Sequence, residues 1–333
     1  MNEKNIIRIG TFNLLNLTVP EMLYYNKQKI SGEDFSRKKD WINQQLDAMN
    51  ADIVGFQELF HESALRNILN DNPNYENARI VVGHNKEGLP SVGLFSRFPI
   101  TDFQVFNEFP EQLVVDGMTI PFTHFSRPVL KCTVQVRPDL QFIVVVAHLK
   151  SKRPMIADGA DGRDPVEIAK GQARSLLMRS AEANALRTVL MNVLKERDYP
   201  VIVMGDMNDT HTSVTTRIIS GDPPFRHMPM ERKLEIWDTL LYHVKDIQAR
   251  MSYTDVYYTY IHNGHYEALD HIMVSQELVK ENPKNIGRVG NVRVLNDHLI
   301  DETLSEDRVP NWQSDHGQVV VSIELNDRNK PNL

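Results

Sequence analysis

Several short apolar runs in this sequence end abruptly in acidic, amide or imidazole side chains, the groups that bind metal ions and move protons. Because the ends of neighbouring strands meet at one edge of a sheet, we expect these side chains to share one cleft. A single polar strand end carries little weight, but six in one chain indicate a site. The six points are Asn13 after 9–12, Glu58 after 53–56, His148 after 144–147, Asp206 and Asn208 after 201–204, Asp270 after Leu269, and Asp315 with His316 just before 318–325.

The carboxylates among these groups favour a bound divalent cation. Mg²⁺ prefers oxygen ligands and is often held by one or two carboxylates together with water and substrate phosphate. Glu58 and Asp315 are the candidates for that role. Asp315 also precedes His316 directly, where its charge would instead raise the pKa of the imidazole.

The other groups fit the hydrolysis of a phosphoester. A water nucleophile needs a group that orients it or accepts its proton, and Asp206 could do so. Negative charge gathers on the phosphoryl oxygens in the transition state, and amide or imidazolium donors stabilise it. Asn208, His148 and His316 are the candidate donors.

Strand-like and helix-like stretches alternate along the chain and would position these groups. An apolar stripe with helical spacing over 35–49 follows Ser31 and Asp34, which fit an N-terminal cap. Asp164 before Pro165 predicts the start of a second helix that continues to about Lys195. Strands are predicted at 6–17, 52–59, 130–137, 142–147, 201–204, 268–275 and 318–325.

Composition narrows the class of protein. The 37 basic and 44 acidic residues give a net charge of −7, which argues against a nucleic-acid coat protein but allows a local basic groove. The one cysteine, Cys132, excludes an intrachain disulfide and a zinc site built from four cysteines. Apolar runs stay below the ~18 residues needed to span a bilayer, and the first residues lack a secretory signal pattern. We therefore expect a soluble, cytoplasmic protein folded as one domain over residues 1–333.

Seven strings in order resemble the endonuclease/exonuclease/phosphatase family, which includes DNase-like nucleases, neutral sphingomyelinases and inositol polyphosphate 5-phosphatases. The resemblance covers nearly the whole chain, and the QE, GDxN and SDH elements are jointly specific. It implies an α+β fold, a four-layer sandwich of two packed β-sheets flanked by helices. The strings are TFNLLNL (11–17), QEL (57–59), GLFSRFPI (93–100), VAHLKS (146–151), GDMND (205–209), LDHIMVS (269–275) and SDHGQVVV (314–321).

The resemblance also implies roles for the matching positions. Asn13, Glu58 and Asp315 would place Mg²⁺ or Mn²⁺, with Glu58 the principal ligand. Asp206 would activate water, and Asp270 would support the phosphate-binding histidine or a second metal. His148 and His316 would contact the phosphate, and Asn208 would hold water or phosphate.

Each of these residues also has a structural interpretation. Glu58 could cap the helix expected after His61, because carboxylates favour helix N-termini. Asp206 could be an ordinary turn residue after a glycine. His148 could be a buried histidine with its hydrogen bonds satisfied, and Asp270 could make a local hydrogen bond.

Two charged segments flank the motifs. Residues 149–180 hold seven Lys or Arg against four Asp or Glu, so Lys152 or Arg153 could contact further substrate phosphate, although a solvated helix face explains the charges equally well. Residues 296–307 hold five acids and no Lys or Arg, and beside the cleft they would repel a long polyanion. Four tyrosines could stack on a base or simply pack in a strand: Tyr253, Tyr257, Tyr258 and Tyr260.

The sequence thus predicts a divalent-metal-dependent phosphoesterase, with a phosphodiester in nucleic acid or in a small molecule as the preferred substrate. One alternative is a phosphomonoesterase that acts on a phosphorylated small molecule or lipid. Another is a non-catalytic phosphate-binding module of the same fold, although such a module should have lost one or more of the six polar groups.

Overall fold

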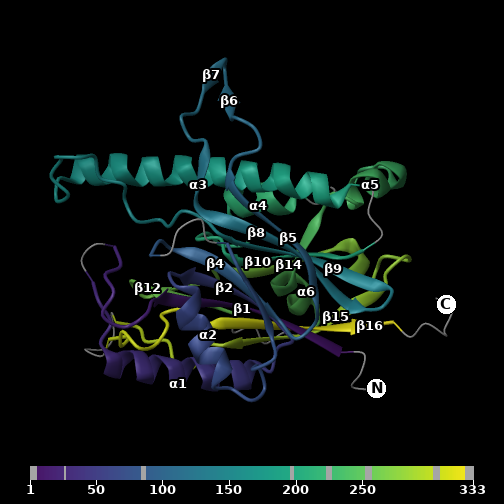
Figure 1. Ribbon diagram of the computed structural model, residues 1–333. Coiled ribbons are helices and arrows are strands. Elements are labelled where there is room, and N and C mark those ends of the chain that lie inside the picture. Colours follow the sequence, from purple (N-terminus) through teal and green to yellow (C-terminus); the bar gives the residue numbers. More distant parts are fainter. Residues whose placement is uncertain are drawn as a thin grey trace.

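Two six-stranded β-sheets form the centre of the molecule (Figure 1). The structure is a computed structural model that describes residues 6–25, 28–83, 88–195, 199–222, 227–251, 257–302 and 308–326. In the first sheet the strand order is β15 (Gly287–Leu295), β16 (Gln318–Leu325), β1 (Ile6–Leu17), β2 (Ile53–Leu59), β4 (Ser91–Ser96) and β3 (Arg79–Val82). In the second it is β11 (Leu241–His243), β14 (Asp270–Ser275), β10 (Val201–Asp206), β9 (Leu140–His148), β8 (His124–Arg137) and β5 (Ile100–Glu108).

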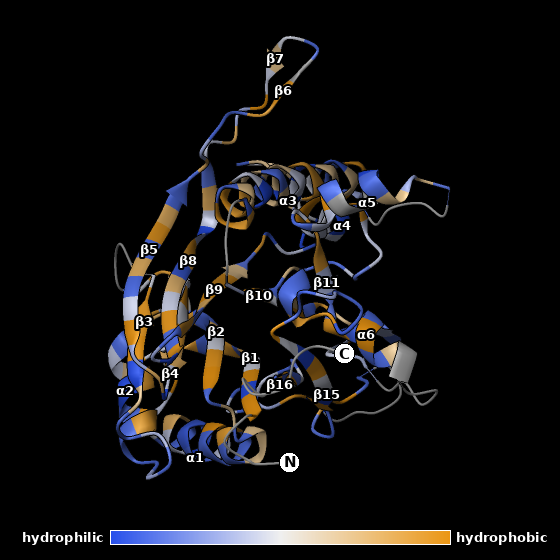
Figure 2. Ribbon diagram, turned by 90° about the vertical axis from the view of Figure 1, so that its right-hand side faces the viewer, coloured by the Kyte–Doolittle hydropathy of each residue, from blue (hydrophilic) through white to orange (hydrophobic). Residues whose placement is uncertain are grey.

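The sheets pack face to face, with helices on both outer surfaces. Ile9 and Val321 of the first sheet share a buried apolar cluster with Val144 and Met204 of the second. Below the first sheet in Figure 1 lie α1 (Gly32–Met49) and α2 (Glu62–Asn70), and above the second lie α3 (Pro165–Leu194) and α4 (Val214–Ser220). Figure 2 shows the apolar residues running along the strands between these layers. The predicted four-layer α+β sandwich is confirmed.

The two helices predicted from the sequence have the expected ends. The Ser31 hydroxyl accepts the backbone N–H of Asp34 at 3.0 Å at the start of α1, and the apolar stripe of this helix is buried. The Asp164 carboxylate accepts the N–H of Val166 at 3.1 Å, and α3 then continues for 30 residues. The described residues also include three shorter helices: α5 (Met230–Trp237), α6 (Val244–Met251) and the 3-10 helix η2 (Gln276–Leu278).

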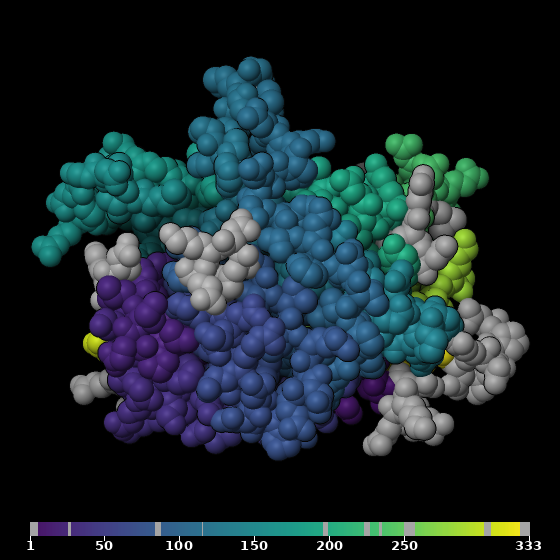
Figure 3. Space-filling view, viewed as in Figure 1, coloured from purple at the N-terminus to yellow at the C-terminus, as the bar shows by residue number. Residues whose placement is uncertain are grey.

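Two small hairpins lie outside the sheets. The strands β6 (Val114–Val115) and β7 (Met118–Thr119) form an arm that stands away from the body of the molecule (Figure 3). The strands β12 (Tyr260–His262) and β13 (His265–Glu267) form the second hairpin. Within the described part of the chain, every helix is too short or too polar to span a lipid bilayer.

Strand direction brings the polar residues to one end of the sandwich. The pairs β1–β2 and β9–β10 are parallel, so each pair ends on the same side. The strands β14 and β16 run antiparallel to their neighbours β10 and β1, so their first residues lie at that same end. A site at this end is therefore built from four strand ends and two strand beginnings.

Gly205 allows β10 to approach β9 closely enough to place Asp206 beside His148. Its φ is +138°, and a Cβ atom there would lie 1.9 Å from the carbonyl oxygen of Ala147. An l-residue at this position must push the two strands apart, because the clash is with backbone.

Gly205→Ala should therefore lower the free energy of unfolding by about 3 kcal/mol or more. Gly32→Ala is the matched control, since nothing lies within 4 Å of a Cβ atom at Gly32. Urea unfolding followed by circular dichroism measures both variants. Equal stability of the two would contradict the close approach of β9 and β10.

Candidate active site

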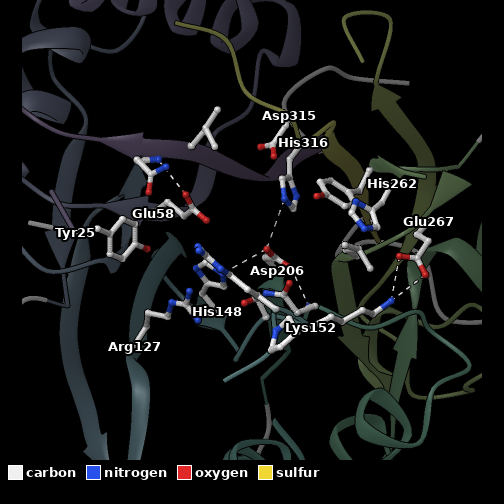
Figure 4. A pocket seen from close by; sticks show the side chains of 18 of the residues that line it. Tyr25, Glu58, Arg127, His148, Lys152, Asp206, His262, Glu267, Asp315 and His316 are labelled. Atoms are coloured by element: carbon white, nitrogen blue, oxygen red, sulfur yellow. Dashed lines mark hydrogen bonds and ion pairs between the residues drawn. The ribbon is translucent and has the colours of Figure 1, made fainter. Parts of the chain in front are cut away.

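A cavity of about 970 Å³ opens at this end of the sandwich (Figure 4). Asp206 lies at its centre in the figure, with Glu58, Tyr25 and Arg127 on one side. Of the predicted site residues, all but Asn13 and Asp270 line it directly, and those two contact the lining residues from behind. The lining includes Tyr25, Glu58, Arg127, His148, Lys152, Arg153, Asp206, Asn208, Tyr260, Asp315 and His316.

Sheet register places three of the predicted residues in one row. His148 on β9 and Asp270 on β14 are the direct register partners of Asp206 on the strand between them. The Nε2 atom of His148 lies 3.4 Å from Oδ2 of Asp206. All three side chains are buried, with exposed fractions of 2% or less.

The first sheet adds two more groups to the Asp206 carboxylate. Asn13 on β1 donates its amide N–H to Oδ2 of Asp206 at 3.2 Å, which connects the two sheets. His316, just before β16, places Nε2 at 3.9 Å from the same oxygen. The other oxygen, Oδ1, accepts the backbone N–H of Asn208 at 2.9 Å. Burial raises the pKa of Asp206 to about 7, although the nearby His316 opposes the shift.

His316 is held by Asp270 and not by its sequence neighbour Asp315. The Nδ1 atom of His316 lies 2.8 Å from Oδ2 of Asp270. Burial alone would lower the pKa of His316, but the charges of Asp270 and Asp206 outweigh it and raise that pKa well above its usual value. Asp315 also raises this pKa, as its place next to His316 predicted, but it contributes less than Asp270 and Asp206 do.

His148 differs from His316 in charge. Burial, with a further contribution from Arg127, lowers the pKa of His148 well below its usual value, so the ring is neutral. The sequence grouped His148 with His316 as a candidate imidazolium. Burial and the positive charges of Arg127, His316 and Lys150 explain the difference.

Glu58 and Asp315 face the cavity from the first sheet. Glu58 has φ of +58°, and its carboxylate accepts the backbone N–H of Asn16 at 3.0 Å. Residue His61 occupies the N-cap of α2 instead, so Glu58 does not cap that helix. Burial and the charge of Asp315 both raise the pKa of Glu58, which indicates two carboxylates close enough to repel each other.

These carboxylates fit a divalent cation. Among the described residues, Oδ1 of Asp315 and Oδ1 of Asn16 are buried without a hydrogen-bond partner. Two adjacent carboxylates and unpaired oxygen atoms form the hard donor set that Mg²⁺ and Mn²⁺ prefer. Asn13, by contrast, donates its amide N–H to Asp206, and its Oδ1 accepts the backbone N–H of Leu15. It therefore orients the Asp206 carboxylate from outside the cavity lining.

A second set of atoms could also hold a metal. Ligand atoms of Asp206, Asp270 and His316 lie within 4.8 Å of one another. The close ion pair between Asp270 and His316 uses the proton on Nδ1 of that ring. The cavity therefore contains two neighbouring acidic sets, one around Glu58 and one around Asp206.

Lys38 joins the two loops on the Glu58 side. It is 1% exposed, and its ammonium donates to the carbonyl of Leu15 at 2.8 Å and to that of Asn311 at 3.4 Å. Burial lowers its pKa to about 8, although Glu58 and Asp315 oppose the shift. The residue places a positive charge behind the carboxylates without entering the cavity lining.

Arg127 is a cavity residue that the sequence reasoning missed. It lies near the start of the strand β8, which is antiparallel to β9, so it is beside the end of β9 and donates to the carbonyl of Leu149 at 3.2 Å. Arg127 does not follow an apolar run, and it reaches the cavity because an antiparallel neighbour contributes residues near its beginning. The string SRP before an alternating strand was the available signal.

The two basic residues predicted after His148 differ in their surroundings. Lys152 donates to both oxygens of Glu267, at 2.9 and 3.0 Å. Arg153 lines the cavity and shows no ion pair to a described residue. Arg153 thus keeps a positive charge for an anionic ligand, while that of Lys152 is neutralised.

The flanking segments contribute less than their charge suggests. The described part of the acidic segment, 296–302, supplies no residue to the cavity lining, and 303–307 lie outside the described residues. Tyr253 also lies outside them. Tyr260 packs its ring on His316 with 4.9 Å between ring centres and lines the cavity, so it is more than a packing residue.

The sequence model of the Endonuclease/Exonuclease/phosphatase family matches residues 10–316. The chain belongs to this family. This confirms the resemblance carried by the seven strings. No curated protein matches the chain at a significant level.

Solved structures share the fold at low sequence identity. A humanized D. rerio TDP2 is 15% identical, covers 96% of this chain and 99% of its own, and has a TM-score of 0.56. The catalytic domain of human nocturnin, with bound sulfate, is 16% identical, with 97% and 95% covered and a TM-score of 0.51. A family protein from Bacteroides vulgatus is 16% identical, with 96% and 99% covered and a TM-score of 0.54.

Glu182 of α3 holds the Arg127 and His148 segments together from behind. Its buried carboxylate accepts the N–H and hydroxyl of Ser126, at 2.7 and 2.6 Å, and the N–H of Lys150 at 2.6 Å. Ser126 precedes Arg127, and Lys150 follows His148 by two residues. One side chain thus fixes two edges of the cavity.

Glu182→Ala should cost about 3 kcal/mol of stability, because it removes the buried acceptor of two backbone N–H groups and of one hydroxyl. Glu182→Gln retains one acceptor oxygen and should cost less. Thermal and urea unfolding compare both with Glu33→Ala, whose side chain is 76% exposed. A Glu182→Ala protein as stable as Glu33→Ala would rule out this role.

Proposed function

We propose that the protein is a divalent-metal-dependent phosphoesterase that hydrolyses phosphodiester bonds by attack of water. The observation that carries the proposal is the set of groups around one carboxylate. One oxygen of Asp206, Oδ2, accepts the amide N–H of Asn13 and lies near the rings of His148 and His316. Glu58 and Asp315 line the same cavity. Hydrolysis of a phosphoester needs both a base for water and a cation for the phosphate, and this cavity offers residues for each.

Asp206 is the proposed base. Its carboxylate orients a water molecule toward phosphorus and accepts a proton as the bond to phosphorus forms. The amide of Asn13 and the backbone N–H of Asn208 hold the carboxylate in one orientation. Because the pKa of Asp206 is raised by burial, the group accepts a proton more readily than an exposed aspartate would.

The donors for the phosphate come from the other residues of the cavity. His316, kept protonated by Asp270, donates to a phosphoryl oxygen, and neutral His148 contacts another. Arg127 and Arg153, which also line the cavity, add positive charge that attracts the phosphate. Asn208 lines the cavity, and its amide N–H donates to the carbonyl of Leu149 at 3.0 Å. This hydrogen bond fixes the loop after β10.

Glu58 and Asp315 would hold the Mg²⁺ or Mn²⁺. When bound there, the cation acts as a Lewis acid that stabilises negative charge on the phosphate and on the leaving oxygen. Asp270 has a second possible role, as a ligand of a further metal together with Asp206. The buried ion pair with His316 favours the first role, support of the histidine.

A phosphodiester is the preferred substrate class. A D. rerio TDP2 structure of the same fold is described as a complex with a single-strand DNA product. The cavity, about 970 Å³, also has the size to accept a small phosphorylated molecule or a lipid headgroup, so a phosphomonoesterase is the second candidate. Cleavage of bis-p-nitrophenyl phosphate, compared with p-nitrophenyl phosphate, separates the two.

The proposed base and the proposed phosphate donor can be tested by substitution. Purified protein should hydrolyse bis-p-nitrophenyl phosphate with Mg²⁺ or Mn²⁺ and lose that activity in EDTA. Asp206→Asn and His316→Ala should each reduce kcat by at least about 100-fold, since general acid–base groups contribute about 10²–10⁴-fold. Asp102→Asn, at an exposed position on β5, is the control and should leave kcat unchanged. Full activity in a folded Asp206→Asn protein would refute the proposal.

A further prediction compares the two adjacent basic side chains, Arg153 and Lys152. Arg153→Ala should raise KM for a diester substrate about tenfold or more, because it removes an unpaired charge from the cavity wall. Lys152→Ala should raise KM less, because Glu267 already neutralises this ammonium. A larger effect at Lys152 in steady-state kinetics would show that the substrate displaces Glu267 from it.

Two expectations from the sequence are kept as part of the proposal. We propose one domain over residues 1–333, which agrees with the 10–316 span of the family match. The cytoplasmic location stays a prediction.

A further inference from the structure

A second cavity, of about 390 Å³, lies between β11, α4 and α6 and shares no lining residue with the first. Two histidines and an aspartate face it: His211 from the loop after β10, His243 from the end of β11, and Asp246 from α6. None of these residues takes part in the proposed hydrolysis.

His243 is the unexplained group in this cavity. It is 5% exposed, and neither of its ring nitrogens has a hydrogen-bond partner among the described residues. Burial of an imidazole without any partner is unfavourable, because the ring loses its hydrogen bonds to water. The neighbouring His271 cannot compensate through Nε2, which lies 2.8 Å from the carbonyl oxygen of Asp209.

The other two groups lie close to each other. The Nε2 atom of His211 is 3.5 Å from Oδ1 of Asp246, and Nδ1 of His211 is buried without a described partner. Two ligands of one tetrahedral Zn²⁺, with bonds of about 2.0–2.2 Å, lie about 3.4 Å apart. This pair therefore already has the spacing of two ligands of one ion.

We propose that His211, His243 and Asp246 bind a transition-metal ion, with Zn²⁺ as the reference case. Two imidazoles and a carboxylate select metals such as Zn²⁺ over Mg²⁺, which prefers oxygen donors. Water in the remaining space of the cavity completes the coordination.

The charges around the cavity favour a cation over an anion. Arg217, the arginine of the lining, is paired with Asp222 through an Nε–Oδ1 contact of 2.9 Å. The carboxylate of Asp246 would repel a phosphate. His211, His243 and Asp246 can thus donate lone pairs to a cation but provide no positive charge for an anion.

Binding requires a small closure of the site. The ring centres of His211 and His243 are 6.2 Å apart, compared with about 5 Å for two imidazoles on one tetrahedral zinc. Among the described residues, only Asp206, Asp270 and His316 already have three ligand atoms within 4.8 Å of one another. The closure consists of rotation of the His211 and Asp246 side chains, which are 24% and 50% exposed, toward buried His243.

The protein is titrated with Zn²⁺ in saturating Mg²⁺, so that sites made of oxygen ligands are already occupied by Mg²⁺. Calorimetry should give one Zn²⁺ per chain, and Co²⁺ at the same site should give the visible absorption of a tetrahedral complex. His211→Ala and Asp246→Asn should each weaken Zn²⁺ binding at least tenfold. These two variants change partly exposed residues, so they test the site even if His243→Ala fails to fold.

The matched control is His124→Ala. His124 also lies near a carboxylate, 3.7 Å from Glu108, but its side chain is 65% exposed, and Zn²⁺ binding should be unchanged. No stoichiometric binding, or equal affinity in all variants, would overturn the proposal. Loss of binding in Asp270→Asn, with retention in His211→Ala, would overturn it too, because it would assign the ion to the first cavity. None of these readouts uses hydrolysis, so they are independent of the proposed function.

Discussion

The buried carboxylate of Asp206 is the interaction on which the arrangement of this molecule depends. It accepts an amide N–H from the first sheet and lies against imidazoles from both sheets. A carboxylate without solvent must have such partners, because an unpaired buried charge is strongly unfavourable. The packing of the two sheets and the chemistry of the cavity are therefore linked at one side chain.

Backbone geometry around this point supports the same view. Gly205 lets two strands approach more closely than any side chain would permit. Glu58 and Asn208 both have left-handed backbone conformations, at φ of +58° and +53°. Non-glycine residues seldom adopt such angles, and their occurrence together is typical of functional sites, where packing elsewhere compensates for the strain. The fold holds these side chains in orientations that an isolated turn would not choose.

Much of this could be predicted from sequence, because strand ends are easy to recognise. Apolar runs that stop at Asn13, Glu58, His148 and Asp206 fixed which side chains meet once the strands were parallel. The four-layer fold needed the family resemblance, since periodicity alone gave only alternating helices and strands.

The remaining features depend on tertiary contacts that no local pattern encodes. Arg127 enters the cavity because β8 is antiparallel to β9, and a short run of residues does not reveal its partner strand. Asp270, 46 residues before His316, holds that ring, whereas Asp315, next to His316 in the sequence, lines the cavity. The histidines of the second cavity lay far apart in sequence and had no spacing that suggested a shared ligand.

A cation held by Glu58 and Asp315, across the cavity from Asp206, leaves the Asp206 carboxylate for water. Anomalous diffraction from crystals soaked in Mn²⁺ locates that cation. We expect a Mn²⁺ peak bonded to Glu58 and Asp315. A peak held only by Asp206, Asp270 and His316, or no peak in this cavity, would contradict it.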